Sequence, residues 1–374
     1  MKTIRRLLFR QVLHAVAFVA LAFLLLFFFF DLLDQLDDVA RYGKQGYTLG
    51  YALLHVVLLV PSHIYELLPI AVLIGAIYVM ARMAESSEFT ILRTSGLGPG
   101  RALATLLLLG AAFVMLTFLF GDYLAPDANR AAQLLRTRFW GEITVGRTGA
   151  WLKDKTPERV YSVNVGAMNA SGDMSNVRIF EFGADGRMVA TLQAAQAQFG
   201  DGRWLLKNVY ERRFVHLAAG GDGGGGERPQ IATRALAEMD WPTQLSSDMV
   251  AATLLSPDRM RTVDLFRYIS HLNDNGQSAQ RYEIEFWRKV FYPLSCLVMV
   301  VLALPFAYLH FRTGNIAGYV FLGVLAGISF FLLNNVFGFI GNLRNWEPWL
   351  TAAAPSFIYS LLSLAAFGWL VLRQ

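Results

Sequence analysis

The sequence predicts a membrane protein with six transmembrane helices, in two groups of three, separated by an inserted β-rich domain. Three observations predict this fold. The 374 residues are 55% hydrophobic and only 16% charged, whereas soluble domains carry about a quarter charged residues. The apolar residues gather in long runs toward both ends of the chain. The middle of the chain instead shows short alternating segments separated by turn residues, which is typical of β-strands.

A helix needs about 20 apolar residues to cross the hydrocarbon core of a bilayer. Six apolar runs are candidate spans. One of them, Thr48–Ala81, is longer than one span requires and contains Pro61, Glu66 and Pro69. We interpret it as one kinked helix, with two shorter elements as the alternative, because neighbouring helices can satisfy carbonyls that a proline frees. The other five runs contain no Asp, Glu, Lys or Arg: Val12–Phe30, Ala102–Phe120, Val290–Leu309, Thr313–Leu343 and Trp349–Leu372.

The basic residues beside the spans predict the orientation. The first apolar run follows several bases, but it continues too far for a signal peptide and is expected to be a retained span. Its far end carries Asp31, Asp34, Asp37 and Asp38. The positive-inside rule therefore places both termini in the cytoplasm and the insert in the periplasm of a bacterial inner membrane. Nine bases define the cytoplasmic side, against two acids, Glu85 and Glu88: Lys2, Arg5, Arg6, Arg10, Arg82, Arg93, Arg101, Arg312 and Arg373.

These spans divide the chain into three parts: 1–122 with the first three helices, an insert at 123–289, and 290–374 with the last three. Within the insert, residues 123 to about 140 are predicted to be helical, and a β-sandwich or β-jellyroll follows. The glycine run Gly220–Gly226 is interpreted as a hairpin tip. An amphipathic helix spans Val263 to Leu272, and another begins near Ser278. The predicted strands are Arg159–Val165, Val177–Phe182, Met188–Phe199 and Trp204–Phe214.

No catalytic constellation is visible in the sequence. The six histidines, at positions 14, 55, 63, 216, 271 and 310, lack the spacing of metal ligands, and the single Cys296 excludes a disulfide framework. The net charge of +5 resides mostly at span ends and in the insert, which favours membrane topology and anionic-lipid contact over nucleic-acid binding. We therefore expect no enzyme activity and no cofactor in this chain.

The segment Glu85–Gly96 between the second and third spans is more informative. Phe89, Leu92 and Arg93 occupy neighbouring helical positions, Glu88 precedes Leu92 by one turn, and Gly96 can end the helix. A short amphipathic helix on the cytoplasmic side could dock in a groove of a partner protein. A plain interfacial connector is the alternative.

Two further sets of residues are candidate sites near the membrane. Glu66 is an ionisable group near membrane depth and therefore a functional candidate, unless it lies at the outer surface. A basic set lies just outside the membrane, and guanidinium groups suit phosphates and carboxylates, although a solvated helix face would look the same. This set consists of Arg130, Arg136 and Arg138 after the third span and Arg41 and Lys44 after the first.

The chain as a whole resembles the LptF/LptG family of lipopolysaccharide export permeases. The segments that carry the resemblance are Asp31–Leu36, Pro61 with Leu68–Gly75, Ser87–Gly96, and the run from Asp264 to Leu294 that contains Phe286-Trp287-Arg288-Lys289. Their order and spacing, rather than any single motif, resemble the family. Within it, the Asp-Gln-Leu after the first span and the Leu-Pro-Ile of the second are more similar to the LptG branch than to the LptF branch.

The resemblance implies a permease subunit of an ATP-driven exporter that extracts lipopolysaccharide from the inner membrane toward the outer membrane. It implies a heterodimer with the paralogous permease LptF, on two copies of the cytoplasmic ATPase LptB, which would bind ATP and Mg. It also implies a bitopic partner, LptC, and a periplasmic bridge, LptA, that extend the line of β-jellyrolls.

The resemblance also assigns roles to individual residues. Glu88 and Arg93 match the coupling helix of the family, which implies ATPase docking by Glu88, Phe89, Leu92 and Arg93. Arg136 matches a basic position after the third span, so it is the first candidate for contact with the phosphates of lipopolysaccharide, with Arg130 and Arg138 behind it. Family members often have lysines where this chain has Asp31, Asp37 and Asp38, and carboxylates there suit bridging divalent cations. Asp31, Leu33 and Asp37 complete the lipopolysaccharide-binding set.

Three other functions are weighed against this one. The LptF-type paralogue of the same complex would show the same layout. A membrane receptor with a periplasmic sensing domain would need a cytoplasmic signalling domain, and the loops are too short for one. An intramembrane lipid-modifying enzyme would need clustered His, Asp or Ser across the spans, which the sequence does not show.

Overall fold

The computed structural model consists of two compact units. The helical unit contains Met1–Ala132, Arg261–Phe266 and Gln280–Gln374, and the β unit contains Gln133–Met260 and Arg267–Ala279. The predicted insert at 123–289 is defined by the membrane spans rather than by compactness, and it stays a prediction. The residues that the structure describes are 2–96, 98–140, 143–144, 149–156, 159–169, 172–183, 185–200, 203–217, 228–243, 245, 249–250, 257–308 and 316–372.

The helical unit has the predicted membrane-spanning character. Among the described residues, five helices are long and apolar enough to cross a membrane, or six if the bent pair formed by α8 and the helices α9 and η4 counts as one span. The prediction of a helical membrane protein with an inserted β domain is confirmed. The elements are α1 (Lys2–Tyr42), η1 (Gly43–Gln45), α2 (Leu49–Glu85), α3 (Glu88–Thr94), α4 (Pro99–Phe118), η2 (Leu119–Leu124), α5 (Ala125–Trp140), α8 (Gln280–Phe291), α9 (Ser295–Ala303), η4 (Leu304–Tyr308), α10 (Ile316–Arg344) and α11 (Pro348–Leu372).

Helix α2 is the central element of the helical unit. It is one continuous helix with Pro61 and Pro69 inside it, so of the two alternatives the single-helix interpretation is correct. Its most apolar segment is 72% buried, against 6% for that of α1. The two helices approach closely at Gly75, where an added Cβ would lie 2.7 Å from the backbone nitrogen of Val16 and 2.9 Å from its Cα. Only glycine fits at this crossing.

The span after the insert is broken near its start. Helix α8 ends at Phe291 and α9 begins at Ser295, with a bend of 46° between the two segments. Pro293 explains the break, because it lacks an N–H group and disfavours helical geometry at Tyr292, the residue before it. The hydrogen bond from the Leu294 N–H to the Phe291 carbonyl closes a tight turn there.

A second irregularity lies where the third span continues into α5. Residues Leu119–Leu124 (η2) form a π-helical turn, a feature that is frequent at functional sites. Gly121 in this turn lies against the Tyr65 ring, and a Cβ at that position would overlap the ring. Asp122 Oδ1 accepts a hydrogen bond of 2.8 Å from the backbone N–H of Thr262, which is the first residue of α7 (Thr262–Asp274).

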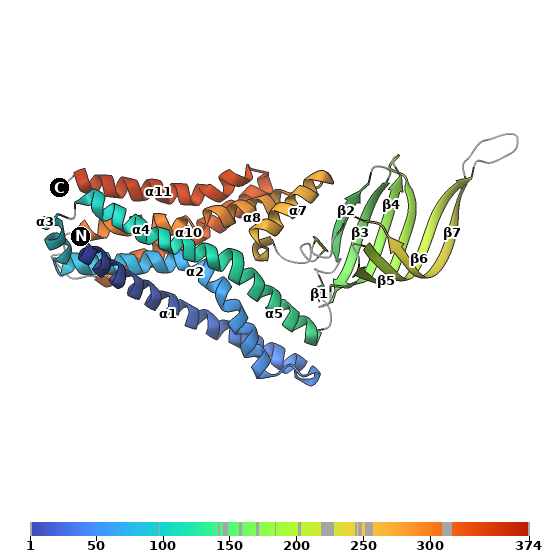
Figure 1. The fold of residues 1–374 in the computed structure, drawn as a ribbon, viewed down its shortest axis with the longest axis horizontal. Coiled ribbons are helices and arrows are strands. Elements are labelled where there is room, and N and C mark those ends of the chain that lie inside the picture. The colour runs from blue at the N-terminus through green and yellow to red at the C-terminus, as the bar shows by residue number, and fades with distance from the viewer. Residues whose placement is uncertain are drawn as a thin grey trace. The chain divides into compact units, whose positions relative to one another are not determined.

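The β unit is built around one antiparallel sheet of seven strands, in the order β1-β3-β4-β5-β6-β7 with β2 also paired to β3 (Figure 1). β1 and β2 pair with different parts of β3, so they share one edge of the sheet. Trp204 is fully buried in its core, and its indole N–H donates a 2.7 Å hydrogen bond to the Leu245 carbonyl. The strands are β1 (Ile143–Thr144), β2 (Ala150–Lys155), β3 (Arg159–Met168), β4 (Met174–Gly183), β5 (Met188–Gly200), β6 (Arg203–Leu217) and β7 (Arg228–Trp241).

The four predicted strands correspond to β3, β4, β5 and β6, each one to four residues longer than predicted. The predicted helices after the third span and after the sheet correspond to α5, α7 and α8. The sequence analysis did not name β1, β2 and β7. β7 is an edge strand whose residues 230–235 are exposed on both faces, so it lacks the alternation of a half-buried strand. The predicted hairpin tip Gly220–Gly226 lies outside the described residues.

Candidate functional site

The candidate docking helix α3 is set off from α2 by a sharp turn. The N–H groups of Ser86 and Ser87 donate to the carbonyls of Arg82 and Ala84, and Ser87 has a left-handed backbone with φ of 56°. Gly96 follows the helix with φ of +100°, a conformation that glycine adopts without steric cost. The predicted short helix and its glycine stop are therefore present. In the helical unit, α3 lies at the same end as both chain termini (Figure 1).

One face of α3 anchors the helix to the rest of the helical unit. Phe89 is 2% exposed, and its ring packs edge-on against Tyr308 of η4, with the centroids 5.0 Å apart. Leu92, one turn later, packs partly buried against the same core. Burial of a phenylalanine side chain contributes about 1.5–3 kcal/mol. Phe89 and Leu92, which the sequence analysis had assigned to partner docking, thus face the helical unit.

The side chains of Glu88, Ile91 and Arg93 on α3 are exposed. Glu88 and Arg93 flank the buried face, each about 40° from one of its two residues, whereas Ile91 points about 160° away from Phe89. Ile91 is 61% exposed, although it carries the only other large aliphatic side chain of the helix. The sequence analysis missed Ile91. The sequence could have identified Ile91 as exposed, because an isoleucine two residues after Phe89 cannot share a helix face with it.

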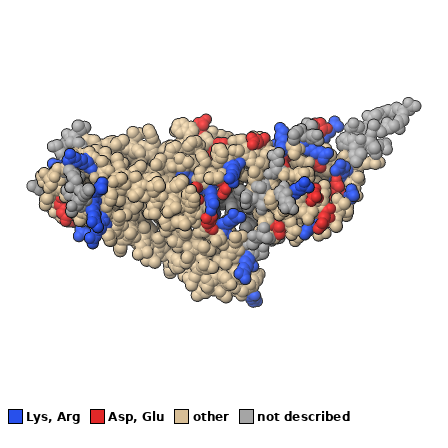
Figure 2. Space-filling view, in the orientation of Figure 1, with Lys and Arg blue, Asp and Glu red and all other residues tan. Residues whose placement is uncertain are grey.

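The surface around this end of the helical unit is basic. Figure 2 shows Lys and Arg gathered there, next to a broad band in which charged side chains are scarce. The band matches the apolar segments of the candidate spans. The exposed bases of these segments are Arg5, Arg6, Arg10, Arg82, Arg93 and Arg101.

The acidic candidates lie near the other end of α1. Asp31 is not a free carboxylate: its Oδ2 lies 2.6 Å from Nε2 of His63 on α2, and the ring of Phe27 lies 5.1 Å from the ring of His63. Leu33 is 44% exposed, and Asp37 is exposed as well. Asp31 therefore ties α1 to α2, whereas Leu33 and Asp37 are available at the surface.

The basic candidates after the third span all lie on α5, and Arg130, Arg136 and Arg138 are exposed. They do not form one cluster. At 3.6 residues per turn, Arg136 points about 120° away from Arg130 and about 160° away from Arg138. Arg130 and Arg138 differ by only about 80°, so these two share a face of the helix.

Glu66 lies beside a group of polar side chains that the sequence did not reveal. Its own side chain is exposed, and its backbone carbonyl accepts a 2.5 Å hydrogen bond from the Tyr292 hydroxyl. The Tyr292 ring also packs 5.1 Å from that of Tyr65. Lys289 is 5% exposed, and its Nζ donates a 3.2 Å hydrogen bond to the carbonyl of Gly121 in the π-helical turn.

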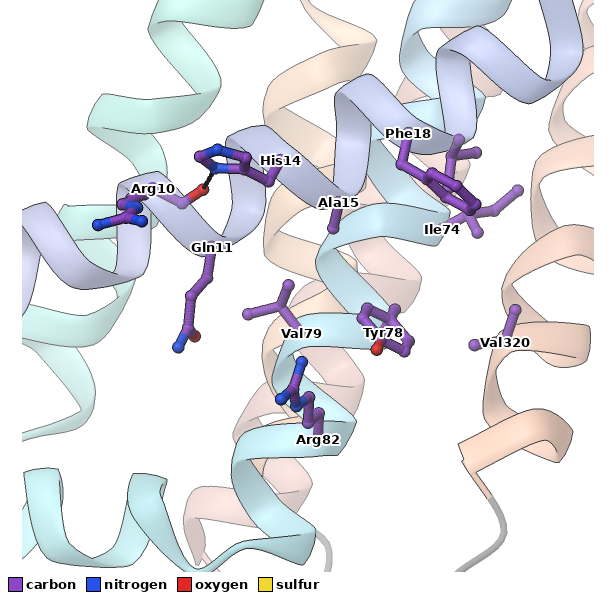
Figure 3. Close-up of a pocket in the computed structure, with 11 residues that line it drawn as sticks. Arg10, Gln11, His14, Ala15, Phe18, Ile74, Tyr78, Val79, Arg82 and Val320 are labelled. Atoms are coloured by element: carbon purple, nitrogen blue, oxygen red, sulfur yellow. Dashed lines mark hydrogen bonds between the residues drawn. The ribbon is translucent and has the colours of Figure 1, made fainter.

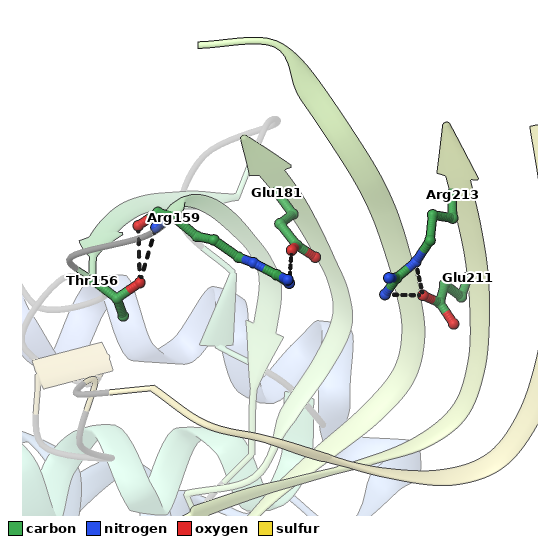
Figure 4. Close-up of polar contacts among 5 residues, drawn as sticks. All are labelled: Thr156, Arg159, Glu181, Glu211 and Arg213. Atoms are coloured by element: carbon green, nitrogen blue, oxygen red, sulfur yellow. Dashed lines mark hydrogen bonds and ion pairs between the residues drawn. The ribbon is translucent and has the colours of Figure 1, made fainter. Parts of the chain in front are cut away.

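Two of the buried carboxylates in the described part of the β unit pair with arginines. Glu181 on β4 pairs with Arg159, and Glu211 on β6 pairs with Arg213 at 2.9 Å (Figure 4). Both guanidinium groups are about half-exposed, whereas the carboxylates are nearly buried. The carboxylate of Glu181 raises the pKa of Arg159, and burial raises the pKa of the neighbouring Tyr161. Each arginine thus compensates a charge that would otherwise be buried alone.

Within the described ranges, no three His, Cys, Asp or Glu side chains are close enough to hold a metal ion. Cys296 is buried, with its Sγ 3.3 Å from Oγ1 of Thr117.

Comparison with known proteins identifies the relatives of the chain. A family model described as lipopolysaccharide export system permease LptF/LptG matches residues 6–371. The LptG permease protein of Escherichia coli K12 is 26% identical over 342 residues, which cover 90% of each chain. The LptG protein of Haemophilus influenzae is 25% identical over 336 residues, which cover 89% of this chain and 88% of the relative.

Proposed function

Because the chain belongs to the LptF/LptG family of lipopolysaccharide export permeases, we propose that it is driven through α3 by a separate cytoplasmic ATPase. It is a permease subunit similar to LptG and not itself an ATPase. The family match across residues 6–371 is the observation that carries this conclusion. It spans both helical groups and the inserted β domain, so it concerns the whole architecture rather than one segment.

The proposed assembly is a heterodimer with the paralogous permease LptF on two copies of the ATPase LptB, which bind ATP and Mg. LptC and the periplasmic bridge LptA complete the route to the outer membrane. Both termini and α3 lie in the cytoplasm, and the part of the chain from 123 to 289 lies in the periplasm. The gathering of basic side chains beside α3 supports this orientation (Figure 2).

The docking surface of α3 consists of Glu88, Ile91 and Arg93. Ile91 supplies apolar area for a groove on the ATPase, and the flanking charges set its register. Phe89 and Leu92 instead hold α3 against the helical unit. Because different residues dock the ATPase and anchor α3, the helix can transmit force while it stays packed on the helical unit.

The docking surface is tested in the assembled exporter, in lipid, by measuring ATP hydrolysis and lipopolysaccharide release together. Glu88→Ala, Arg93→Ala and Ile91→Asp should each lower release per ATP hydrolysed while the complex remains folded. Thr90→Ala is the matched control, because Thr90 is exposed on the same helix and is not part of the proposed surface. Normal release in all three variants would show that α3 does not dock the ATPase through these residues.

For the cargo, we propose that lipopolysaccharide contacts Arg130, Arg136 and Arg138 through its phosphates. Leu33, Asp37 and Asp31 are proposed as further contacts, and Glu66 as an additional candidate. A photocrosslinking residue at Leu33 or Arg136 should capture lipopolysaccharide during ATP hydrolysis. The control position is Phe357, which is also largely exposed, on α11. Equal capture at Phe357 would indicate non-specific contact with membrane lipid.

A further inference from the structure

A cavity of about 590 Å³ lies in the helical unit between α1, α2 and α10, on the part of α1 near the N-terminus (Figure 3). Ligand-binding cavities commonly measure about 300–1,000 Å³, so this one is large enough for a ligand. It is lined by Arg10, Gln11, His14, Ala15, Phe18, Val19, Ile74, Tyr78, Val79, Arg82 and Val320.

One end of the cavity is positively charged. Arg10 comes from α1 and Arg82 from α2, and the side chain of Gln11 lies between the two helices (Figure 3). No acidic residue lines the cavity, and neither guanidinium has an acidic partner within the described parts of the chain. His14 does not neutralise them, since its Nδ1–H donates to the Arg10 carbonyl at 2.6 Å. An anion would therefore complete this end of the cavity.

The rest of the cavity is apolar. Ala15, Phe18 and Ile74 continue along α1 and α2, and Val320 adds a wall from α10. Phe18 is 74% exposed, so the cavity is open along this side. A ligand that fits must carry a negative charge at one end and an apolar chain at the other.

The depth of the cavity matches a lipid headgroup. Arg10 is separated from Asp31, near the other membrane surface, by about 30 Å of helix at a rise of 1.5 Å per residue. This length equals the thickness of the hydrocarbon core. Arg10 and Arg82 thus lie at the level of the headgroups, on the side of the membrane that carries α3 and the chain termini.

We propose that this cavity binds an anionic phospholipid of that leaflet. Its phosphate lies between the guanidinium groups of Arg10 and Arg82, which suit bidentate phosphate binding. One acyl chain runs along Phe18, Ile74 and Val320. An apolar helix of a partner protein would leave the two guanidinium groups without an anion.

The test uses the full-length chain in a mild detergent, titrated with phosphatidylglycerol or with zwitterionic phosphatidylethanolamine, with bound lipid counted by native mass spectrometry. The wild-type chain should retain phosphatidylglycerol preferentially. The double variant Arg10→Gln/Arg82→Gln should weaken that binding at least tenfold, because charge-assisted hydrogen bonds from two arginines are lost. The matched control is Arg5→Gln/Arg6→Gln, which removes the same charge from exposed positions of α1 outside the cavity.

A second variant guards against loss of folding in the first. Ala15→Phe fills the apolar end without changing the charge, and it should also reduce phosphatidylglycerol retention. Thermal unfolding without added lipid verifies that each variant is folded. Equal losses in the Arg5/Arg6 control, no loss in either cavity variant, or displacement of the phospholipid by lipopolysaccharide would each overturn the proposal.

Discussion

The close approach of α1 and α2 at Gly75 can be tested by adding a single methyl group. In Gly75→Ala, the new Cβ would lie 2.7 Å from the backbone nitrogen of Val16 and 2.8 Å from its Cγ2. Carbon atoms at their optimal separation lie about 3.5–4.0 Å apart. The backbone of α1 would therefore have to move by about 1 Å, because a backbone atom cannot rotate away as a side chain can.

Extra methyl groups in a well-packed core cost about 1–3 kcal/mol, so Gly75→Ala should destabilise the helical unit by that amount. The matched control is Gly50→Ala, near the start of the same helix. An added Cβ there would meet only Thr48 Oγ1, at 3.8 Å. Replacing a helical glycine by alanine normally stabilises a helix by about 0.5–1 kcal/mol. The two variants should therefore differ by about 1.5–4 kcal/mol, with opposite signs.

Both variants would be compared with the wild-type chain by denaturant titration in one detergent, with helix content followed by circular dichroism. Gly75→Ala should unfold at a lower denaturant concentration and Gly50→Ala at the same or a higher one. If Gly75→Ala were as stable as Gly50→Ala, the close packing of α1 on α2 would be refuted as the reason for the glycine.

Three further predictions concern other parts of the structure. Phe89→Ala should cost about 3–5 kcal/mol of local stability, because the contact with Tyr308 is lost, and faster amide hydrogen exchange in residues 88–94 would show it; unchanged protection would contradict the anchoring role. Lys289→Met should cost about 1–3 kcal/mol, because the Gly121 carbonyl loses a hydrogen-bond donor, and denaturant titration should then give a lower midpoint than for wild type. Burial raises the pKa of Tyr161 above its ordinary value near 10, so the β unit keeps this contribution to stability below pH 10 and loses it as pH rises further. The melting temperature of the wild type should consequently fall more steeply between pH 9 and 11 than that of Tyr161→Phe; parallel curves would exclude the effect.

The sequence predicted the helical membrane fold because an apolar run of about 20 residues is compatible with few structures other than a transmembrane helix. Half-buried strands were also recognisable, since β4 and β5 alternate buried and exposed residues over most of their length. The edge strand β7 was not, because a strand with both faces exposed carries no such alternation. The lengths of the helices that contain the spans were underestimated for a similar reason. Helix α1 extends to Tyr42, beyond its apolar run, and polar residues there do not reveal helical continuity.

The site was predicted by position but not by orientation. A short helix within Glu85–Gly96 was expected between the second and third spans, and the structure has it at Glu88–Thr94. Its two faces could not be assigned without knowing what lies against it. Phe89 is buried because Tyr308, more than 200 positions later in the chain, lies beside it. Lys289 presents the same difficulty. A tryptophan and basic residues beside a span are typical of an interfacial anchor. The hydrogen-bond partner of Lys289 is instead a carbonyl in a π-helical turn, which no local sequence pattern predicts.

These long-range contacts bear directly on how the permease would respond to the proposed ATPase. α2 is one continuous helix, and the α2–α3 segment contacts the second helical group at two separate places. Beyond the C-terminal end of α2, α3 contacts η4 through Phe89 and Tyr308. Near the middle of α2, Tyr65 packs on Tyr292, whose hydroxyl donates to the Glu66 carbonyl. A displacement of α3 must therefore either move both helical groups or break one of these contacts, and a packed core favours discrete shifts over gradual deformation. The aromatic contacts, rather than the short loops, are consequently the elements that link ATPase docking to the side of the membrane where lipopolysaccharide is proposed to bind.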